Sequence, residues 1–96
     1  MRKVPTYSAS KFPLGRVVAT PGAYDALTPL DIKRGIFFHS QADWGDITKG
    51  EKEANDRALD EGGWLRSAHV AENGTRFLVI TEADRSATTV LLPDEY

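Results

Sequence analysis

Hydrophobic residues occur along this chain in short runs that turn-forming residues separate. Four of the runs are rich in β-branched or aromatic residues, which fit a pleated, half-buried surface, and they predict strands. The predicted strands cover residues 15–20, 64–71, 76–82 and 87–92. Short turns join the last three of them, so these three predict an antiparallel meander.

The turn over residues 72–75 predicts the register of the first hairpin. Asn73-Gly74 occupies its two central positions, where a type I′ turn needs a positive φ twice. The predicted pairs are Thr75 with Glu72, Phe77 with Val70, Val79 with Ala68, and Ile80 with Ser67. One face then carries Ala68, Val70, Phe77 and Val79, and the other carries Leu65, Ser67, His69, Arg76, Leu78 and Ile80. The first face suits a core. The second is too apolar to be simply solvated, so the first segment of the chain covers it or it is an interaction surface.

Two short helices are predicted after the first strand. Thr20-Pro21 supplies an N-cap and a first-turn proline for a helix over about residues 22–27. Thr28-Pro29 repeats the signal and predicts a helical turn that reaches Lys33 or Arg34 and stops at Gly35. The run 36–39 that follows fits a buried strand or the last turn of a helix equally well.

The clearest helix is predicted over residues 49–61, after a loop over residues 40–47. Thr48 and Glu51 have the spacing of a capping box, in which each side chain bonds to the backbone of the other residue. Gly62-Gly63 ends the helix by supplying the left-handed conformation that other residues avoid. Ala54, Ala58 and Leu59 form its apolar stripe.

The length of 96 residues and the hydrophobic fraction of 41% are typical of one globular domain. We expect a flexible N-terminal arm over residues 1–13 and a single α+β domain over residues 14–96. The expected fold is a small antiparallel sheet that ends in the three-stranded meander and packs with two or three helices.

Composition excludes several classes of function. Twelve basic and fourteen acidic residues give a net charge of −2, so a nucleic-acid partner would have to bind without a basic patch. The absence of cysteine excludes disulfides, zinc–thiolate sites and thiol nucleophiles. No apolar run approaches the roughly 20 residues of a transmembrane helix, and no apolar stretch follows the N-terminal basic residues. We therefore expect a cytoplasmic protein without a membrane partner or a cofactor.

Several segments together indicate a family. They are residues 18–23, Asp43-Trp44-Gly45-Asp46, Asn55 with Ala58-Leu59, and, most closely, residues 80–93. Over about residues 14–96 the chain resembles short proteins of bacterial plasmids, integrative elements and phages, a family without an established activity. The resemblance implies an accessory protein of a mobile element. Some members are labelled as type I restriction subunits, but this chain lacks the glycine-rich loop of a methyltransferase. It also has Ala42 where the family pattern has glycine, and His69 where the pattern has an aromatic residue.

Asp43 and Asp46 are candidate metal ligands, because carboxylates on a glycine-containing loop suit a divalent cation. Their spacing differs from that of a calcium loop. In the plainer interpretation, which we adopt, Trp44 anchors the loop in the core, Asp46 caps the next helix and Asp43 bonds to loop amides.

His39, His69, Glu82 and Arg85 are candidate catalytic residues of a small, metal-independent RNase or toxin-like enzyme, provided that the fold brings them together. The alternative is structural. Asp84 and Ser86 then form a turn, and Arg85 binds to Asp46, Asp84 or Glu82.

We favour a non-enzymatic protein that binds a protein or ribonucleoprotein, for instance an inhibitor of a host defence nuclease of the anti-CRISPR or antirestriction type. The candidate binding residues are Trp64, Asp84, Arg85 and Ser86, although for Trp64 a position in the core is the favoured interpretation. Tryptophan is enriched in binding hot spots, and arginine presents five donors to a partner. The other large aromatic residues, Tyr24, Phe37, Phe38, Trp44 and Phe77, are expected mostly in the core.

Overall fold

The structure is a computed structural model that describes residues 2–3 and 10–96. The strands are β1 (Arg2–Lys3), β2 (Arg16–Ala19), β3 (Leu65–Val70), β4 (Arg76–Thr81) and β5 (Ala87–Leu91). The helices are α1 (Pro21–Ala26), α2 (Pro29–Ser40), α3 (Lys49–Glu61) and the 3-10 helix η1 (Pro93–Glu95). Residues 1 and 4–9 of the expected arm lie outside the described residues. Near the end of that arm, Phe12 is buried against the core.

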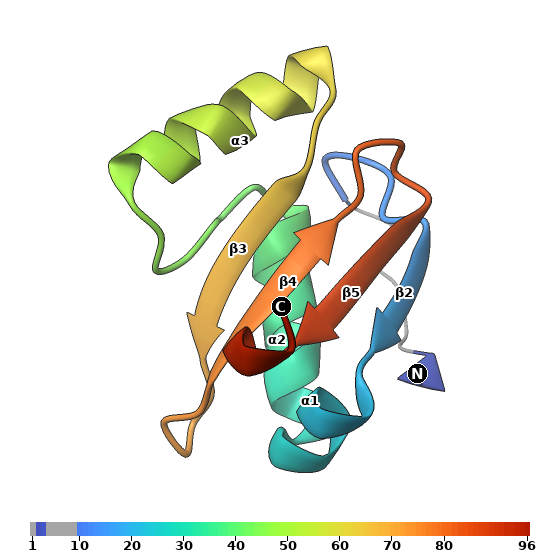
Figure 1. Ribbon diagram of the computed structural model, residues 1–96, viewed down its shortest axis with the longest axis vertical. Helices are drawn as coiled ribbons and strands as arrows, with labels where there is room; N and C mark the ends of the chain where they lie inside the picture. The colour runs from blue at the N-terminus through green and yellow to red at the C-terminus, as the bar shows by residue number, and fades with distance from the viewer. Residues whose placement is uncertain (1, 4–9) are drawn as a thin grey trace.

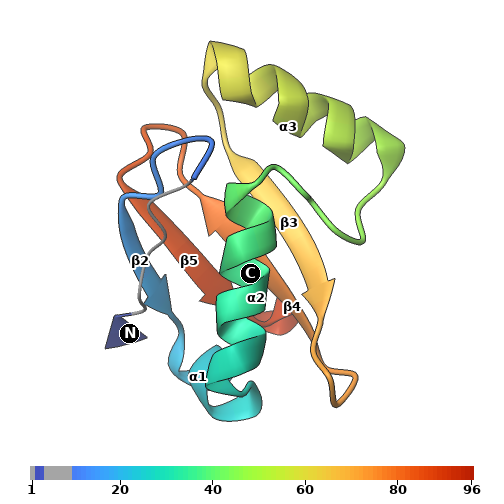
Figure 2. The same ribbon diagram turned by 180° about the vertical axis from the view of Figure 1, so that it is seen from behind.

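The five strands form one sheet in the order β1-β2-β5-β4-β3. The predicted α+β packing and the C-terminal meander are confirmed, but the sheet is mixed, because β2 pairs with β5 in parallel. Local patterns predict the pairing only of strands that a short turn connects. The pairing of Val17 with Thr88 joins residues far apart in the sequence, so its direction depends on the path of the chain. Helices α1 and α2 cover one face of the sheet, and among the described residues no helix longer than η1 lies over the opposite face (Figures 1 and 2).

Helix α2 continues through Gly35, where we expected it to stop. A Cβ atom at Gly35 would lie 2.4 Å from the Phe77 ring, so this glycine lets the helix approach the sheet closely. The ambiguous run 36–39 therefore forms the last turns of α2. Both predicted threonine caps are confirmed, because the side chains of Thr20 and Thr28 accept from Ala23 N and Asp31 N, respectively.

Helix α3 has the predicted bounds and the predicted capping box between Thr48 and Glu51. Its buried face differs from the expected one. Ala58 is buried as expected, but Ala54 is exposed and Asn55 is buried instead. The helix therefore contacts β3 through an amide as well as through a small apolar side chain.

The hairpin of β3 and β4 is shifted by one residue from the predicted register. Phe77 pairs with His69, and Val79 with Ser67. The reason is the turn. Among residues 72–75 only Gly74 has a positive φ, +89°, and its backbone N–H donates to Ala71 O at 2.9 Å. This is the pattern of a three-residue loop with a bulge at the glycine, whereas a type I′ turn needs two positive φ values.

A shift of one residue moves side chains to the opposite face of a strand. The face of the hairpin under α2 consequently carries Leu65, Ser67, His69, Phe77, Val79 and Thr81. The opposite face, here called the open face, carries Arg66, Ala68, Val70, Leu78 and Ile80. The first segment does not cover the open face, because β2 joins the sheet itself; η1 contacts β4 on this side instead (Figure 1).

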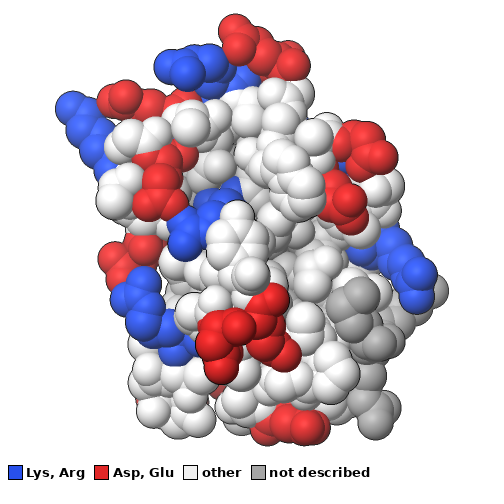
Figure 3. Space-filling view, in the orientation of Figure 1, with Lys and Arg blue, Asp and Glu red and all other residues white. Residues whose placement is uncertain are grey.

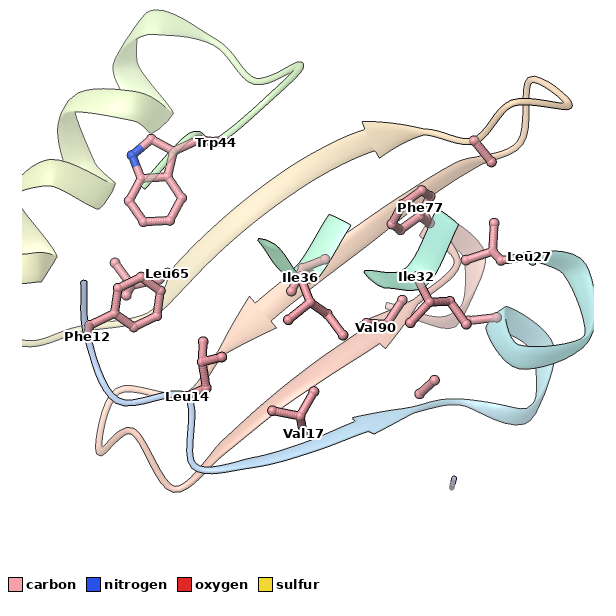
Figure 4. Close-up of a cluster of buried hydrophobic side chains, with 14 of the residues drawn as sticks. Phe12, Leu14, Val17, Leu27, Ile32, Ile36, Trp44, Leu65, Phe77 and Val90 are labelled. Atoms are coloured by element: carbon pink, nitrogen blue, oxygen red, sulfur yellow. The ribbon is translucent and has the colours of Figure 1, made fainter. Parts of the chain in front are cut away.

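The main core lies between α2 and the sheet (Figure 4). Its labelled side chains are Phe12, Leu14, Val17, Leu27, Ile32, Ile36, Trp44, Leu65, Phe77 and Val90. Trp44 and Phe77 are core residues as expected. Tyr24, Phe37 and Phe38 are 40–44% exposed, which contradicts the expected burial. The period of α2 places Phe37 and Phe38 on its outer side, because Ile32 and Ile36 already occupy the side that faces the sheet.

The free edge of β3 is closed by side-chain and loop atoms. The Asn55 amide donates to Arg66 O at 2.7 Å and accepts from Arg66 N at 3.1 Å. Two positions along, Ala68 N donates to Trp44 O and Ala68 O accepts from Asp46 N. The amide and the loop thus replace a neighbouring strand, which protects an edge that would otherwise be open to pairing with another chain.

Gly45 makes this closure sterically feasible. It has a φ of +71°, and a Cβ atom there would lie 2.1 Å from Ala68 O. Ala42, in the same loop, has a φ of +59°, in the left-handed region that favours glycine.

Replacing Asn55 with alanine removes both bonds to the edge of β3. We expect a loss of about 1–3 kcal/mol in the free energy of unfolding, because two backbone groups lose their partners. Urea unfolding measures this loss, and Glu53→Ala, at an exposed position of the same helix, is the control. An Asn55→Ala midpoint equal to that of the control would contradict the proposed closure.

Candidate functional site

His39 is completely buried where α2 ends, and both of its ring nitrogens are hydrogen-bonded. Nδ1 lies 2.7 Å from Ser67 Oγ, and Nε2 lies 2.8 Å from Thr81 Oγ1. The chain of bonds extends in both directions. Thr81 Oγ1 lies 2.7 Å from Thr88 Oγ1, Thr88 Oγ1 donates to Leu14 O at 2.7 Å, and His69 Nε2 lies 2.8 Å from Ser67 Oγ.

The direction of these bonds follows from the chemistry of their far end. Leu14 O can only accept, so Thr88 uses its single hydroxyl proton there. Thr81 must then donate to Thr88. Since the Thr81 proton is also used, His39 must donate to Thr81 through Nε2–H.

The donors in the other half of the hydrogen-bond chain, through Ser67 and His69, are assigned in the same way. Burial, with smaller effects of the charges of His69 and Arg85, lowers the pKa of His39 to about 3. The ring is therefore neutral at pH 7, and Nδ1 accepts from the Ser67 hydroxyl. Ser67 has no second proton, so His69 donates to it through Nε2–H. This hydrogen-bond chain ends on the backbone carbonyl of Leu14, which can only accept, so it offers no route for proton transfer beyond that point. Its role is to hold the core together.

The Arg85 side chain connects the turn between β4 and β5 to the end of α3. It donates to Gly63 O at 2.6 Å and to Ala58 O at 2.8 Å, carbonyl groups at the C-terminal end of that helix. Its guanidinium group also lies 6.0 Å from the centre of the Phe12 ring. A cation at a helix C-terminus is favoured by the helix dipole. Arg85 therefore binds carbonyl groups, and the described residues include no ion pair between it and Asp46, Asp84 or Glu82.

Asp84 and Ser86, the other turn residues, bond to each other. Ser86 N donates to Asp84 Oδ1 at 3.0 Å, and hydrogen bonds from the Ser86 hydroxyl and backbone lower the pKa of Asp84. Both side chains are exposed.

The four candidate catalytic residues do not form one concave site. Ser67 bridges the two histidines, and His39 is enclosed by the core. Glu82 lines a pocket with Trp64 on the open face of the sheet. Arg85 uses its guanidinium group on carbonyl groups. An acid–base pair needs two groups within reach of one substrate, and this arrangement supplies none from these four residues.

The candidate metal ligands also lie apart from any ligand cluster. Asp46 forms an ion pair with Arg76 at 2.9 Å, whereas the N-cap of α3 is Thr48, so the expected cap by Asp46 is wrong. Trp44 is buried as expected, and its Nε1–H donates to Asp56 at 3.1 Å. Within residues 2–3 and 10–96, no three His, Asp or Glu side chains are placed to hold a metal ion.

Trp64 has 60% of its surface accessible, so the favoured position in the core is wrong and its indole is exposed at the entrance of β3. It lines a pocket of about 230 Å³ on the open face, here called the aromatic pocket. The residues that line it are Trp64, Ile80, Glu82, Thr89, Leu91 and Tyr96. The sequence indicates Trp64 but not Tyr96 as a candidate. The central carbon of the Arg66 guanidinium group lies 5.8 Å from the centre of the Tyr96 ring. Only the strand register shows that Ile80 and Leu91 lie beside both aromatic rings.

Comparison of this chain with known proteins identifies no relative. No protein-family model, no curated protein and no solved structure matches this chain. Among the described residues, no helix has the length and apolar character needed to cross a membrane.

Replacing Arg85 tests its contacts and its backbone conformation separately. Arg85 has a φ of +62°. Arg85→Ala should lose about 2–3 kcal/mol of stability, because bonds from a charged donor to carbonyl groups are lost. Arg85→Gly should lose about 1 kcal/mol less, because glycine adopts a positive φ without strain. Urea unfolding measures both, with exposed Arg57→Ala as the control. Equal losses for the alanine and glycine variants would show that the positive φ at position 85 does not reduce the stability of the fold.

The pKa of His39 predicts a pH-dependent stability. The folded pKa of about 3 lies below the ordinary 6.5, so the unfolded chain binds more protons between these values. Stability should therefore fall as the pH decreases below 6.5, by about 2 kcal/mol at pH 5 from this residue alone.

His39→Gln removes the titrating group while keeping one donor and one acceptor. We expect the variant to be less stable at pH 7.5, and to lose about 2 kcal/mol less than the wild type between pH 7.5 and pH 5. Urea unfolding at both pH values measures the difference. Identical losses in the two proteins would show that His39 is not the group responsible.

Proposed function

We propose that this chain is a non-enzymatic protein that binds another protein through the aromatic pocket. The exposure of Trp64 beside that pocket carries the proposal. An exposed indole leaves a large apolar area in water, and its burial by a partner would contribute on the order of 2 kcal/mol or more. Tryptophan and tyrosine at the centre of an interface are typical binding hot spots.

The pocket indicates the chemistry of the partner. Its floor consists of Ile80 and Leu91, which suits an aliphatic side chain. Glu82 stands on its wall, so a basic residue next to the aliphatic one would be complementary. Figure 3 shows uncharged atoms over much of the open face, with a basic group just left of its middle and acidic clusters below and to the right. We therefore propose a partner segment that combines an aliphatic anchor with a lysine or arginine.

A narrower proposal follows from the sequence resemblance. In it, the chain is an accessory protein of a mobile genetic element, and the partner belongs to a host defence nuclease of the CRISPR or restriction type. The net charge of −2 supports binding to the protein part of such a complex, since strong binding to bare nucleic acid needs a basic surface.

The test is capture of partners from a bacterial lysate by three forms of the protein. Wild type and Leu30→Ala should capture the same partner, and Trp64→Ala should capture at least tenfold less, because a hot-spot residue contributes 1.4 kcal/mol or more. Leu30 is the matched control, as it is 52% exposed but lies on α2, outside the pocket.

The captured partner is then purified, and its affinity for each form is measured directly. Similar affinities for wild type and Trp64→Ala would refute the pocket as the binding surface. The narrower proposal has its own outcome, because it predicts that the partner is a nuclease subunit and that the wild type inhibits DNA cleavage by that nuclease.

A further inference from the structure

A second pocket, of about 410 Å³, lies on the other side of the sheet, between α2, the loop that follows it and β3. We call it the His69 pocket. The polar and aromatic side chains at its walls are Asp31, Arg34, Phe38, Asp46, His69, Glu72 and Phe77. None of the residues that line the aromatic pocket belongs to it, so the two sites are independent.

His69 presents a hydrogen-bond acceptor to this pocket. Its Nε2–H is committed to Ser67, because the Ser67 proton is used on the buried His39 ring. Burial lowers the pKa of His69, partly offset by the charge of Asp43, so the ring is neutral at pH 7. The lone pair is then on Nδ1, for which the described residues supply no partner. Gly45, without a side chain, lies beside Nδ1: a Cβ atom there would be only 3.1 Å away.

The charges around the pocket favour a cation. Its walls carry three carboxylates, Asp31, Asp46 and Glu72, and one guanidinium group, that of Arg34. Asp31 is occupied, because it accepts from Thr28 and from Glu72 N, and Arg34 acts electrostatically on it.

The other two carboxylates differ in their partners. Asp46 is shared with Arg76 outside the pocket. Glu72 has no ion pair within the described part of the chain. The pocket therefore keeps an unbalanced negative charge beside an acceptor nitrogen, and the part-exposed ring of Phe38 adds a surface on which a cation can stack.

We propose that the His69 pocket binds a guanidinium group, such as that of an arginine side chain. Nδ1 of His69 accepts one N–H, the Glu72 carboxylate offsets the charge, and the Phe38 ring contacts the planar face. A guanidinium group is favoured over a metal ion, because it presents several donors to separate acceptors. The described residues offer no cluster of three metal-ligating side chains.

The experiment uses the full chain with ¹⁵N-labelled histidine at pH 7.5. Long-range ¹H–¹⁵N spectra of the free protein should show His69 protonated at Nε2 and not at Nδ1. N-acetyl-arginine amide is then added, with N-acetyl-citrulline amide as a neutral probe of nearly the same shape. The arginine probe should move the His69 Nδ1 resonance in a saturable way, with a dissociation constant at least about threefold lower than that of the citrulline probe.

Two variants with the same change of charge locate the site. Glu72→Gln should weaken arginine binding about threefold, and Glu61→Gln, at an exposed position of α3 outside the pocket, should leave it unchanged. The proposal is overturned if Nδ1 carries the proton in the free protein, if the two probes bind equally, if His69 does not respond, or if both variants weaken binding alike. The result is independent of the Trp64 test, because that test concerns the other pocket.

Discussion

The rest of the structure depends on the two hydrogen bonds of His39. This side chain comes from the last turn of α2, and its bonds reach β3 through Ser67 and β4 through Thr81. Thr88 continues the chain to β5 and to Leu14 at the start of β2. A buried polar group without a partner is costly, so helix, strands and N-terminal segment must stay in one relative position for all of these groups to be satisfied.

Helix α3 is held in a different way. Its buried surface is small, with only Asn55 and Ala58 buried, so apolar packing cannot account for its position. Three polar contacts do so: Asn55 on the edge of β3, Asp56 on the Trp44 indole, and Arg85 on the carbonyl groups at the end of the helix. These contacts also close the free edge of the sheet. The backbone groups that they occupy at that edge are therefore not available for pairing with another strand.

The two proposed sites depend on these constraints. The His69 pocket has a defined acceptor because the tautomer of His69 is determined by the buried hydrogen-bond chain, which begins at the carbonyl group of Leu14, just before β2. The aromatic pocket exists because Ser67, His69, Thr81 and Thr88 face α2, so that Ile80 and Leu91 alternate to the open face. One strand register thus produces a pocket with charged walls on one side and an apolar pocket on the other.

The sequence by itself determined the features that depend on neighbouring residues. The caps at Thr20, Thr28 and Thr48, the bounds of α3, the meander and the burial of Trp44 all follow from side chains that act within a few positions. The tertiary structure decided what depends on distant contacts. Helix α2 continues through Gly35 because the absence of a side chain there leaves room for the Phe77 ring. The parallel direction of β2 appears only in its pairing with the distant strand β5. Arg85 binds carbonyl groups at and just after the end of α3. The faces of the hairpin are reversed on β3 because, within the turn over residues 72–75, only Gly74 adopts a positive φ. A local pattern states which residues can turn, cap or be buried, but the partner of each is decided only when segments far apart in the sequence pack together.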